Sequence, residues 1–126
     1  MHAVHIIETL NAIGHAYSIC RDMHVGDTII GIKGRIGFEA PAALLLIKAH
    51  HALEKHVLTK WQMMQKDQLS NWYGNWIHEA LYLDPVMRDM EAFLQSSQSN
   101  VYGEVKLKLS PYRFEVVGVD SAFDLM

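Results

Sequence analysis

The sequence contains one cysteine, three prolines and no long apolar run. Because Cys20 has no partner for an intrachain disulfide, we expect a reducing, cytoplasmic setting. The longest apolar stretch, residues 41–47, is far shorter than the roughly 20 residues that cross a bilayer. These features predict neither a membrane span nor a membrane partner.

Clusters of one charge are also missing. The net charge is −3, and the 11 basic residues are spread along the chain. Nucleic-acid binding needs a basic face, so we expect no nucleic-acid partner. With 50% hydrophobic and 20% charged residues, the composition is typical of a folded globular protein, and 126 residues suit one domain. We therefore predict a single domain over residues 1–126.

Helical spacing of apolar residues covers most of the chain. It predicts helices over residues 2–17, residues 41–57, from Thr59 to about Leu81, and after Asp84-Pro85. Thr59 and Asp84 are suitable N-caps, and proline is favoured in a first helical turn. Gly14 marks a fraying end of the first helix. That helix begins at the first residues without a cap, which suggests that the chain was cut from a longer one.

The same spacing predicts which side chains are buried. On the helix over 41–57 the expected core face consists of Ala42, Leu45, Leu46, Ala49, Ala52 and Leu53. The third helix carries a stripe formed by Trp61, Met64, Gln68, Trp72 and Ile77. We interpret the tryptophans and methionines as core residues, with an oligomer surface as the alternative.

Extended segments occur twice. Residues 18–38 combine β-branched side chains with four glycines, which predicts irregular strands. Residues 101–109 and 113–119 alternate apolar and polar positions around Ser110-Pro111-Tyr112, which predicts a β-hairpin. The expected fold class is α+β, with irregular strands and a C-terminal β-hairpin forming a sheet packed with three to four helices.

Several reactive residue types occur without a recognisable site. The eight histidines include His50, His51 and His56, which do not share one helical face, and no H-E-x-x-H motif is present. Surface or cap positions therefore explain them better than a metal site. Cys20 lacks a base at recognisable spacing. The sequence has neither G-x-G-x-x-G nor a P-loop, so we predict no metal ligand, catalytic residue or phosphate loop here.

Residues 21–39 are the exception, because charged side chains lie among glycines there. An arginine in such an open segment can grip the carboxylate of a small ligand with two hydrogen bonds. A surface hairpin held by ion pairs has the same composition, with Lys33 or Arg35 paired to Glu39 or Asp27. Both interpretations stay open from the residues alone.

This segment also carries a family resemblance. The run G-I-K-G-R-I-G-F-E-A-P, followed by L-L-L-I-K-A-H-H-A-L-E-K-H, resembles the argininosuccinate synthase segment G-M-K-S-R-G-x-Y-E-T-P and its A-H-x-A-L-E helix. Later, Y-L-D-P-V-M-R-D-M-E and S-Q-S-N-V-Y-G-E-V-K-L-K-L resemble W-F-S-P-E-R-E and S-Q-E-x-V-x-G-x-V-R-L-K-L of that family. The matches are collinear over about residues 5–120.

The resemblance implies part of an ATP-dependent carbon–nitrogen ligase. Members of this family join citrulline to aspartate, giving argininosuccinate, AMP and pyrophosphate. Their N-terminal ATP-binding domain carries an S-G-G-x-D-T loop that is absent from this chain. We therefore expect ATP and magnesium in the full-length parent, no cofactor in this fragment, and no activity of the fragment alone. The resemblance also implies a homotetramer, with contacts formed by the helices of residues 61–94.

The family's pocket residues carry over only partly. Lys33, Arg35 and Glu39 match family motif positions, and Arg21 matches a family arginine. Gly26 stands where the family has a citrulline-binding glutamate, and Phe38 where it has a tyrosine. The expected substrate-binding residues are Arg21, Gly26, Asp27, Thr28, Lys33, Arg35 and Phe38.

Three accounts of these two departures remain open. Asp27 can supply the missing carboxylate after a local shift. A variant branch can use an N-acylated citrulline, which has no ammonium group that needs a counter-charge. Alternatively, the local match is shifted or the pocket is completed from elsewhere. From a different class, the chain can be a binding or assembly module that descends from the enzyme and has lost its pocket.

Overall fold

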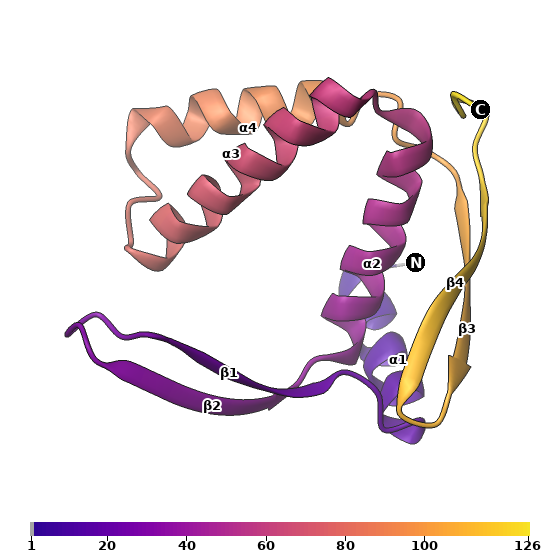
Figure 1. Ribbon diagram of the computed structural model, residues 1–126, viewed down its shortest axis with the longest axis horizontal. Helices are drawn as coiled ribbons and strands as arrows, with labels where there is room; N and C mark the ends of the chain where they lie inside the picture. The colour runs from indigo at the N-terminus through magenta and orange to yellow at the C-terminus, as the bar shows by residue number, and fades with distance from the viewer. Residues whose placement is uncertain (1) are drawn as a thin grey trace. The chain divides into compact units, whose positions relative to one another are not determined.

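Helices and hairpins alternate along the chain. The structure is a computed structural model that describes residues 2–126 (Figure 1). Its helices are α1 (Ala3–Ala16), α2 (Pro41–Val57), α3 (Lys60–His78) and α4 (Pro85–Ser97). Its strands are β1 (Arg21–Asp27), β2 (Lys33–Glu39), β3 (Glu104–Ser110) and β4 (Arg113–Asp120). The predicted α+β class and the C-terminal hairpin are confirmed.

The strands form two separate sheets. β1 pairs only with β2, and β3 only with β4, over the part of the chain that the structure describes. The expectation that the early strands join the C-terminal hairpin in one sheet is therefore wrong. Each strand finds its partner across a short connection, so the backbone hydrogen bonds close locally. The described residues divide into two compact units, 2–52 with 105–118 and 53–104 with 119–126.

The first unit is built around the end of α1 and the start of α2. Ile19, Ala42 and Leu45 are almost fully buried. Gly14 is not a fraying end, because α1 continues to Ala16 and a Cβ atom at position 14 would collide with the side chain of Pro41. The glycine is needed for this close approach. At its other end α1 does have a cap, since the His2 ring accepts a hydrogen bond from the backbone amide of Val4.

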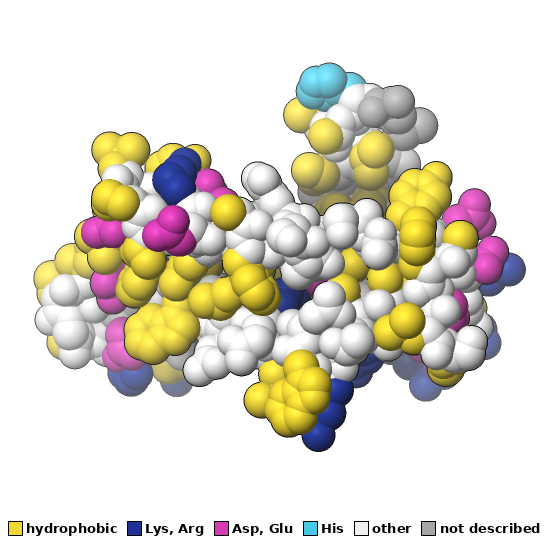
Figure 2. All heavy atoms as spheres, turned by 90° about the horizontal axis from the view of Figure 1, so that it is seen from above, with side chains coloured by type: hydrophobic (Ala, Val, Ile, Leu, Met, Phe, Trp, Pro, Cys, Tyr) yellow, Lys and Arg dark blue, Asp and Glu magenta, His cyan; other side chains and the backbone are white. Residues whose placement is uncertain are grey.

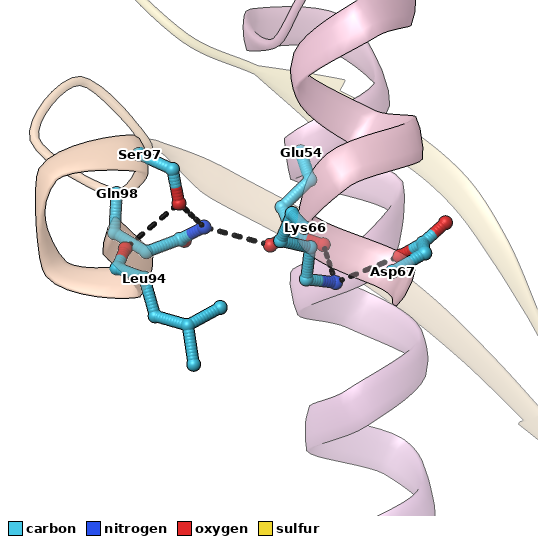
Figure 3. A network of polar contacts seen from close by, with 6 residues as sticks. All are labelled: Glu54, Lys66, Asp67, Leu94, Ser97 and Gln98. Atoms are coloured by element: carbon cyan, nitrogen blue, oxygen red, sulfur yellow. Dashed lines mark hydrogen bonds and ion pairs between the residues drawn. The ribbon is translucent and has the colours of Figure 1, made fainter. Parts of the chain in front are cut away.

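The second unit follows the predicted caps. Thr59 forms a capping box with Gln62 at the start of α3, and the side chain of Asp84 caps α4. The buried residues of this unit are Leu53, Glu54, Val57, Leu58, Met87 and Met90. Glu54 is the one charged residue among them, and Lys66 and Gln98 donate hydrogen bonds to its carboxylate (Figure 3). A polar network is thus enclosed between α2, α3 and the end of α4.

Many apolar side chains stay at the surface. Trp61, Met64, Trp72 and Ile77 are 66%, 52%, 51% and 47% exposed, so the core interpretation of this α3 stripe is wrong. The alternative of an oligomer surface stays a prediction. Leu46 is also exposed, unlike its predicted neighbours on the core face of α2. Figure 2 shows hydrophobic side chains over much of the face that it draws. Among the described residues, no helix is long and apolar enough to cross a membrane.

Candidate functional site

The segment singled out from the sequence folds as the hairpin of β1 and β2. Its register places Arg21 opposite Glu39 at the open end and Asp27 opposite Lys33 beside the turn. In the turn, Gly31 has a φ of +80°, a left-handed conformation that favours glycine. The Thr28 hydroxyl donates a 2.8 Å hydrogen bond to the carbonyl oxygen of residue 32. Thr28 therefore holds the turn closed.

The predicted substrate-binding side chains lie on both faces of this hairpin. Side chains alternate along a strand, and directly paired residues share a face. The register therefore groups Arg21, Asp27, Lys33 and Arg35 on one face. Gly26 and Phe38 belong to the opposite face. The structure thus brings the charged candidates together and separates them from the two positions that depart from the family pattern.

Ion pairs occupy most of the charged face. The Nζ atom of Lys33 lies 2.6 Å from a carboxylate oxygen of Asp27, and Nε of Arg21 lies 3.0 Å from Glu39. The alternative that ion pairs hold the hairpin thus applies to Lys33. Arg35 differs, because within residues 2–126 it makes no hydrogen bond or ion pair and its side chain is exposed. It is the cation of this face that is available to a ligand.

The opposite face is shaped by a histidine. Gly26 is paired with Gly34, so neither strand contributes a side chain there. A Cβ atom at position 26 would lie 2.5 Å from Nε2 of His24. The imidazole thus covers the place that a side chain at position 26 would need. Phe38 lies further along this face, opposite Asp22, and is 38% exposed.

The structure adds a polar cluster at the base of the hairpin that sequence reasoning missed. One oxygen of Glu39 lies 2.8 Å from Nδ1 of His15, and the other accepts the hydrogen bond from Arg21. The hydrogen bond with His15, followed by the hydrogen bond and charge of Arg21, lowers the pKa of the Glu39 carboxyl below its usual value. Glu39 lay in the recognised motif, but nothing in the sequence linked it to a histidine 24 positions earlier.

A surface hollow adjoins this cluster. Its volume is about 370 Å³, and it is lined by Asn11, Ala12, His15, Glu39 and Pro41. The side-chain oxygen of Asn11 accepts a 3.0 Å hydrogen bond from the first turn of α2, at Ala42. That bond fixes Asn11 with its amide nitrogen free to donate. The hollow therefore offers hydrogen-bonding groups from α1 and β2 to a small polar molecule.

Two other candidates have little chemical support. Among residues 2–126, no group of three or more histidine, cysteine, aspartate or glutamate side chains could hold a metal ion. Cys20 is half-buried, and burial raises the pKa of its thiol, which disfavours the reactive thiolate.

Comparison with known proteins decides the family. The family model of the arginosuccinate synthase C-terminal domain matches residues 1–126. The chain belongs to this family.

Curated relatives named argininosuccinate synthase agree with this assignment. Similarity to the enzyme of Dictyoglomus turgidum is 42% identity over 97% of this chain and 31% of the relative. The relative from Xanthomonas campestris pv. campestris is 45% identical over 92% of this chain and 29% of its own length. The relative from Methanocaldococcus jannaschii is 38% identical over 99% of this chain and 32% of its own length. The chain thus spans only about a third of the length of these relatives, and corresponds to the C-terminal domain of the family.

Proposed function

We propose that this chain is the C-terminal part of an argininosuccinate synthase, a ligase of arginine biosynthesis. The complete enzyme joins citrulline, or an N-acylated citrulline, to aspartate and converts ATP to AMP and pyrophosphate. The proposal is supported by the family match over the whole chain and by the names of the relatives. We further propose that this chain contributes one wall of the citrulline pocket through the β1–β2 hairpin and takes part in subunit assembly.

The unpaired guanidinium of Arg35 carries the pocket assignment. It stands on an exposed hairpin face where the neighbouring cations, Arg21 and Lys33, are already bound to carboxylates. A guanidinium holds a carboxylate through two parallel hydrogen bonds, and both amino-acid substrates carry carboxylates. Arg35 is therefore the residue of this chain proposed to contact substrate, while the two ion pairs keep the strands in register.

ATP and magnesium are proposed to bind outside this chain, in the N-terminal ATP-binding domain of the complete enzyme. The described glycines do not form a phosphate-binding loop followed by a helix: Gly26, Gly34 and Gly37 lie within strands and Gly31 in a hairpin turn. We therefore assign no nucleotide contact and no cofactor to residues 2–126, and expect the domain alone to be inactive.

An N-acylated citrulline is favoured over free citrulline as the substrate. Asp27, the residue that could replace the family's glutamate, is bound to Lys33 and lies on the opposite face from Gly26. The space next to Gly26 is covered by the His24 ring, which is not an anion. An acylated substrate has no ammonium group at this place, so the absence of a carboxylate there does not weaken its binding.

Assembly is proposed to use the exposed apolar stripe of α3. Its tryptophans and Met64 are the residue types that are enriched at protein interfaces. A homotetramer is the expected state of the complete enzyme. We also propose that the complete enzyme is cytoplasmic and has no nucleic-acid or membrane partner.

Steady-state kinetics of the full-length protein tests these proposals. With ATP and aspartate present, we expect turnover of N-acylated citrulline and weak use of free citrulline. Replacing Arg35 by alanine should lower kcat/KM about 5- to 150-fold, which corresponds to about 1–3 kcal/mol for an unpaired substrate group. Arg113→Ala, an exposed arginine of β4, is the matched control and should leave the kinetics unchanged.

The other outcomes are distinct. Efficient turnover of free citrulline together with no reaction of the acylated form would reject the substrate assignment but keep the ligase. No turnover of either compound would favour a non-catalytic binding or assembly module. Equal effects of Arg35→Ala and Arg113→Ala on the kinetics would show that the hairpin does not form part of the citrulline pocket.

A further inference from the structure

Helix α2 has an apolar face that the core does not use. Its core residues in the first unit, Ala42 and Leu45, lie on one side of the helix. With about 100° of rotation per residue, Leu44, Ile47 and His51 lie on the opposite side, and Lys48 lies at its edge, about 60° from Leu45. A helix side that faces water is normally polar. The exposure of aliphatic side chains on this side, 64% for Ile47, therefore requires an explanation.

A hollow of about 330 Å³ lies on this second face. It is lined by Leu44, Ile47, Lys48, His51 and Phe114. The helix residues and Phe114 of β4 belong to the same compact unit, so the hollow is a feature of that unit alone. Its volume is at the lower end of the range for small-molecule sites, enough for one ring or a short alkyl chain.

Only apolar atoms line the hollow, and the charge beside it belongs to Lys48. Lys48 makes no hydrogen bond or ion pair within residues 2–126, and no acidic residue stands three or four positions away from it on α2. The nearby strand acid Glu115 is directed to Lys108, at 3.8 Å. The aliphatic stem of a lysine can cover apolar surface while its ammonium group stays at the rim. The hollow thus has apolar walls, and the ammonium group of Lys48 lies outside this lining.

We propose that this hollow binds a small free carboxylate with an apolar body, such as an arylalkyl monocarboxylate. The apolar body fills the space between Leu44, Ile47 and Phe114, and the carboxylate pairs with Lys48. One lysine matches one negative charge, which favours a monocarboxylate over a phosphate. The site is separate from the β1–β2 hairpin, and the inference does not depend on the ligase assignment.

Methyl-labelled NMR of the full-length protein tests this site with 3-phenylpropanoate as the probe. We expect shifts of the Leu44 and Ile47 methyl signals, with a dissociation constant of about 1 mM or lower for a ligand of this size. The neutral amide, 3-phenylpropanamide, should bind about two- to fivefold more weakly, because an exposed ion pair contributes about that factor. Acetate, which lacks the apolar body, should cause no shift.

Variants separate the two parts of the site. Lys48→Met should abolish the difference between acid and amide, while Lys106→Met, an exposed lysine of β3 outside the hollow, should preserve it. Ile47→Glu should raise the dissociation constant of the acid at least tenfold. Because residue 47 is exposed, this variant should keep its helical signal in circular dichroism.

Three results would overturn the proposal. The first is equal affinity for acid and amide in the unmodified protein. The second is a probe response that persists in Ile47→Glu. The third is a shift of the Leu44 and Ile47 signals with protein concentration alone, since a second copy of the chain would then cover this face.

Discussion

Two glutamates in this domain each accept hydrogen bonds from two side chains, but one is partly exposed and the other is buried. Glu39 accepts hydrogen bonds from His15 and Arg21, and its side chain is 32% exposed. Glu54 accepts from Lys66 at 2.7 Å and from Gln98 at 2.9 Å, and is 0% exposed (Figure 3). Water can replace the partners of Glu39 but not those of Glu54.

This difference separates the proposed substrate-binding region from a structural one. Exposed ion pairs add little stability, because both partners remain hydrated when they separate. A buried carboxylate that loses its donors, or donors that lose their carboxylate, cannot be rehydrated without opening the core. The exposed ion pairs of the hairpin therefore cost little to break, whereas the Glu54 cluster holds the end of α2, α3 and α4 together.

The largest predicted effect comes from removal of the buried carboxylate. Glu54→Ala leaves Lys66, which is only 16% exposed, and Gln98 without their main acceptor. The expected loss in the free energy of unfolding is about 3–5 kcal/mol. Urea denaturation measures it, with the exposed Glu8→Ala as a control that should stay near the original stability. A loss no larger than that of the control would show that the burial of Glu54 is not maintained in solution.

The next largest effect is expected where α1 packs against the start of α2, next to the base of the β1–β2 hairpin. Gly14→Ala places a methyl group against Pro41, in a buried contact between α1 and the start of α2. We expect a loss of about 1–3 kcal/mol from overpacking. Gly74→Ala is the matched helical control, because no atom lies within 4 Å of its added Cβ, and it should stabilise α3 by about 0.5–1 kcal/mol. Similar changes at both glycines would mean that α1 and α2 do not pack this closely.

The smallest effect is expected at the exposed cluster. Glu39→Gln keeps the shape of the side chain and removes its charge, so the melting temperature should fall less than in Gly14→Ala. High salt screens exposed charges, and the difference between Glu39→Gln and the original protein should shrink in 1 M salt. A salt-independent loss as large as that of Glu54→Ala would mean that the hairpin base is buried in solution.

The same cluster predicts a direction of pH dependence. The pKa of Glu39 is lowered in the folded state, mainly by the hydrogen bond with His15. Its contribution to stability is therefore complete above the unfolded value of about 4.3 and is lost as the pH falls through the lower folded value. Unfolding curves below pH 5 should show a shallower acid slope for Glu39→Gln. An equal or steeper slope would contradict the ion pairing of this carboxylate.

Local signals in the sequence predicted the helices well. The bounds of α2 and the caps at Thr59 and Asp84 were predicted because capping and helical spacing depend on neighbouring residues only. Met87 and Met90 are buried, which agrees with the interpretation of the methionines as core residues. The expected single sheet was wrong because strand pairing depends on which partner is nearest in space. The exposure of the α3 stripe was predicted only as an alternative, since its residue types resemble those of a core.

The candidate site was also predicted only in part from the sequence. Charge and glycine content indicated either a ligand-binding segment or an ion-paired hairpin at residues 21–39, and the family motif included Arg35 and Glu39. The distribution of the candidates over two hairpin faces, the His24 ring over Gly26 and the contact of His15 with Glu39 needed the register and the packing of α1. Local physics determined the elements, and the family motif marked the segment for function. Only the folded structure decided which charges are paired and which remain available, because these pairings depend on the strand register and on the packing of α1.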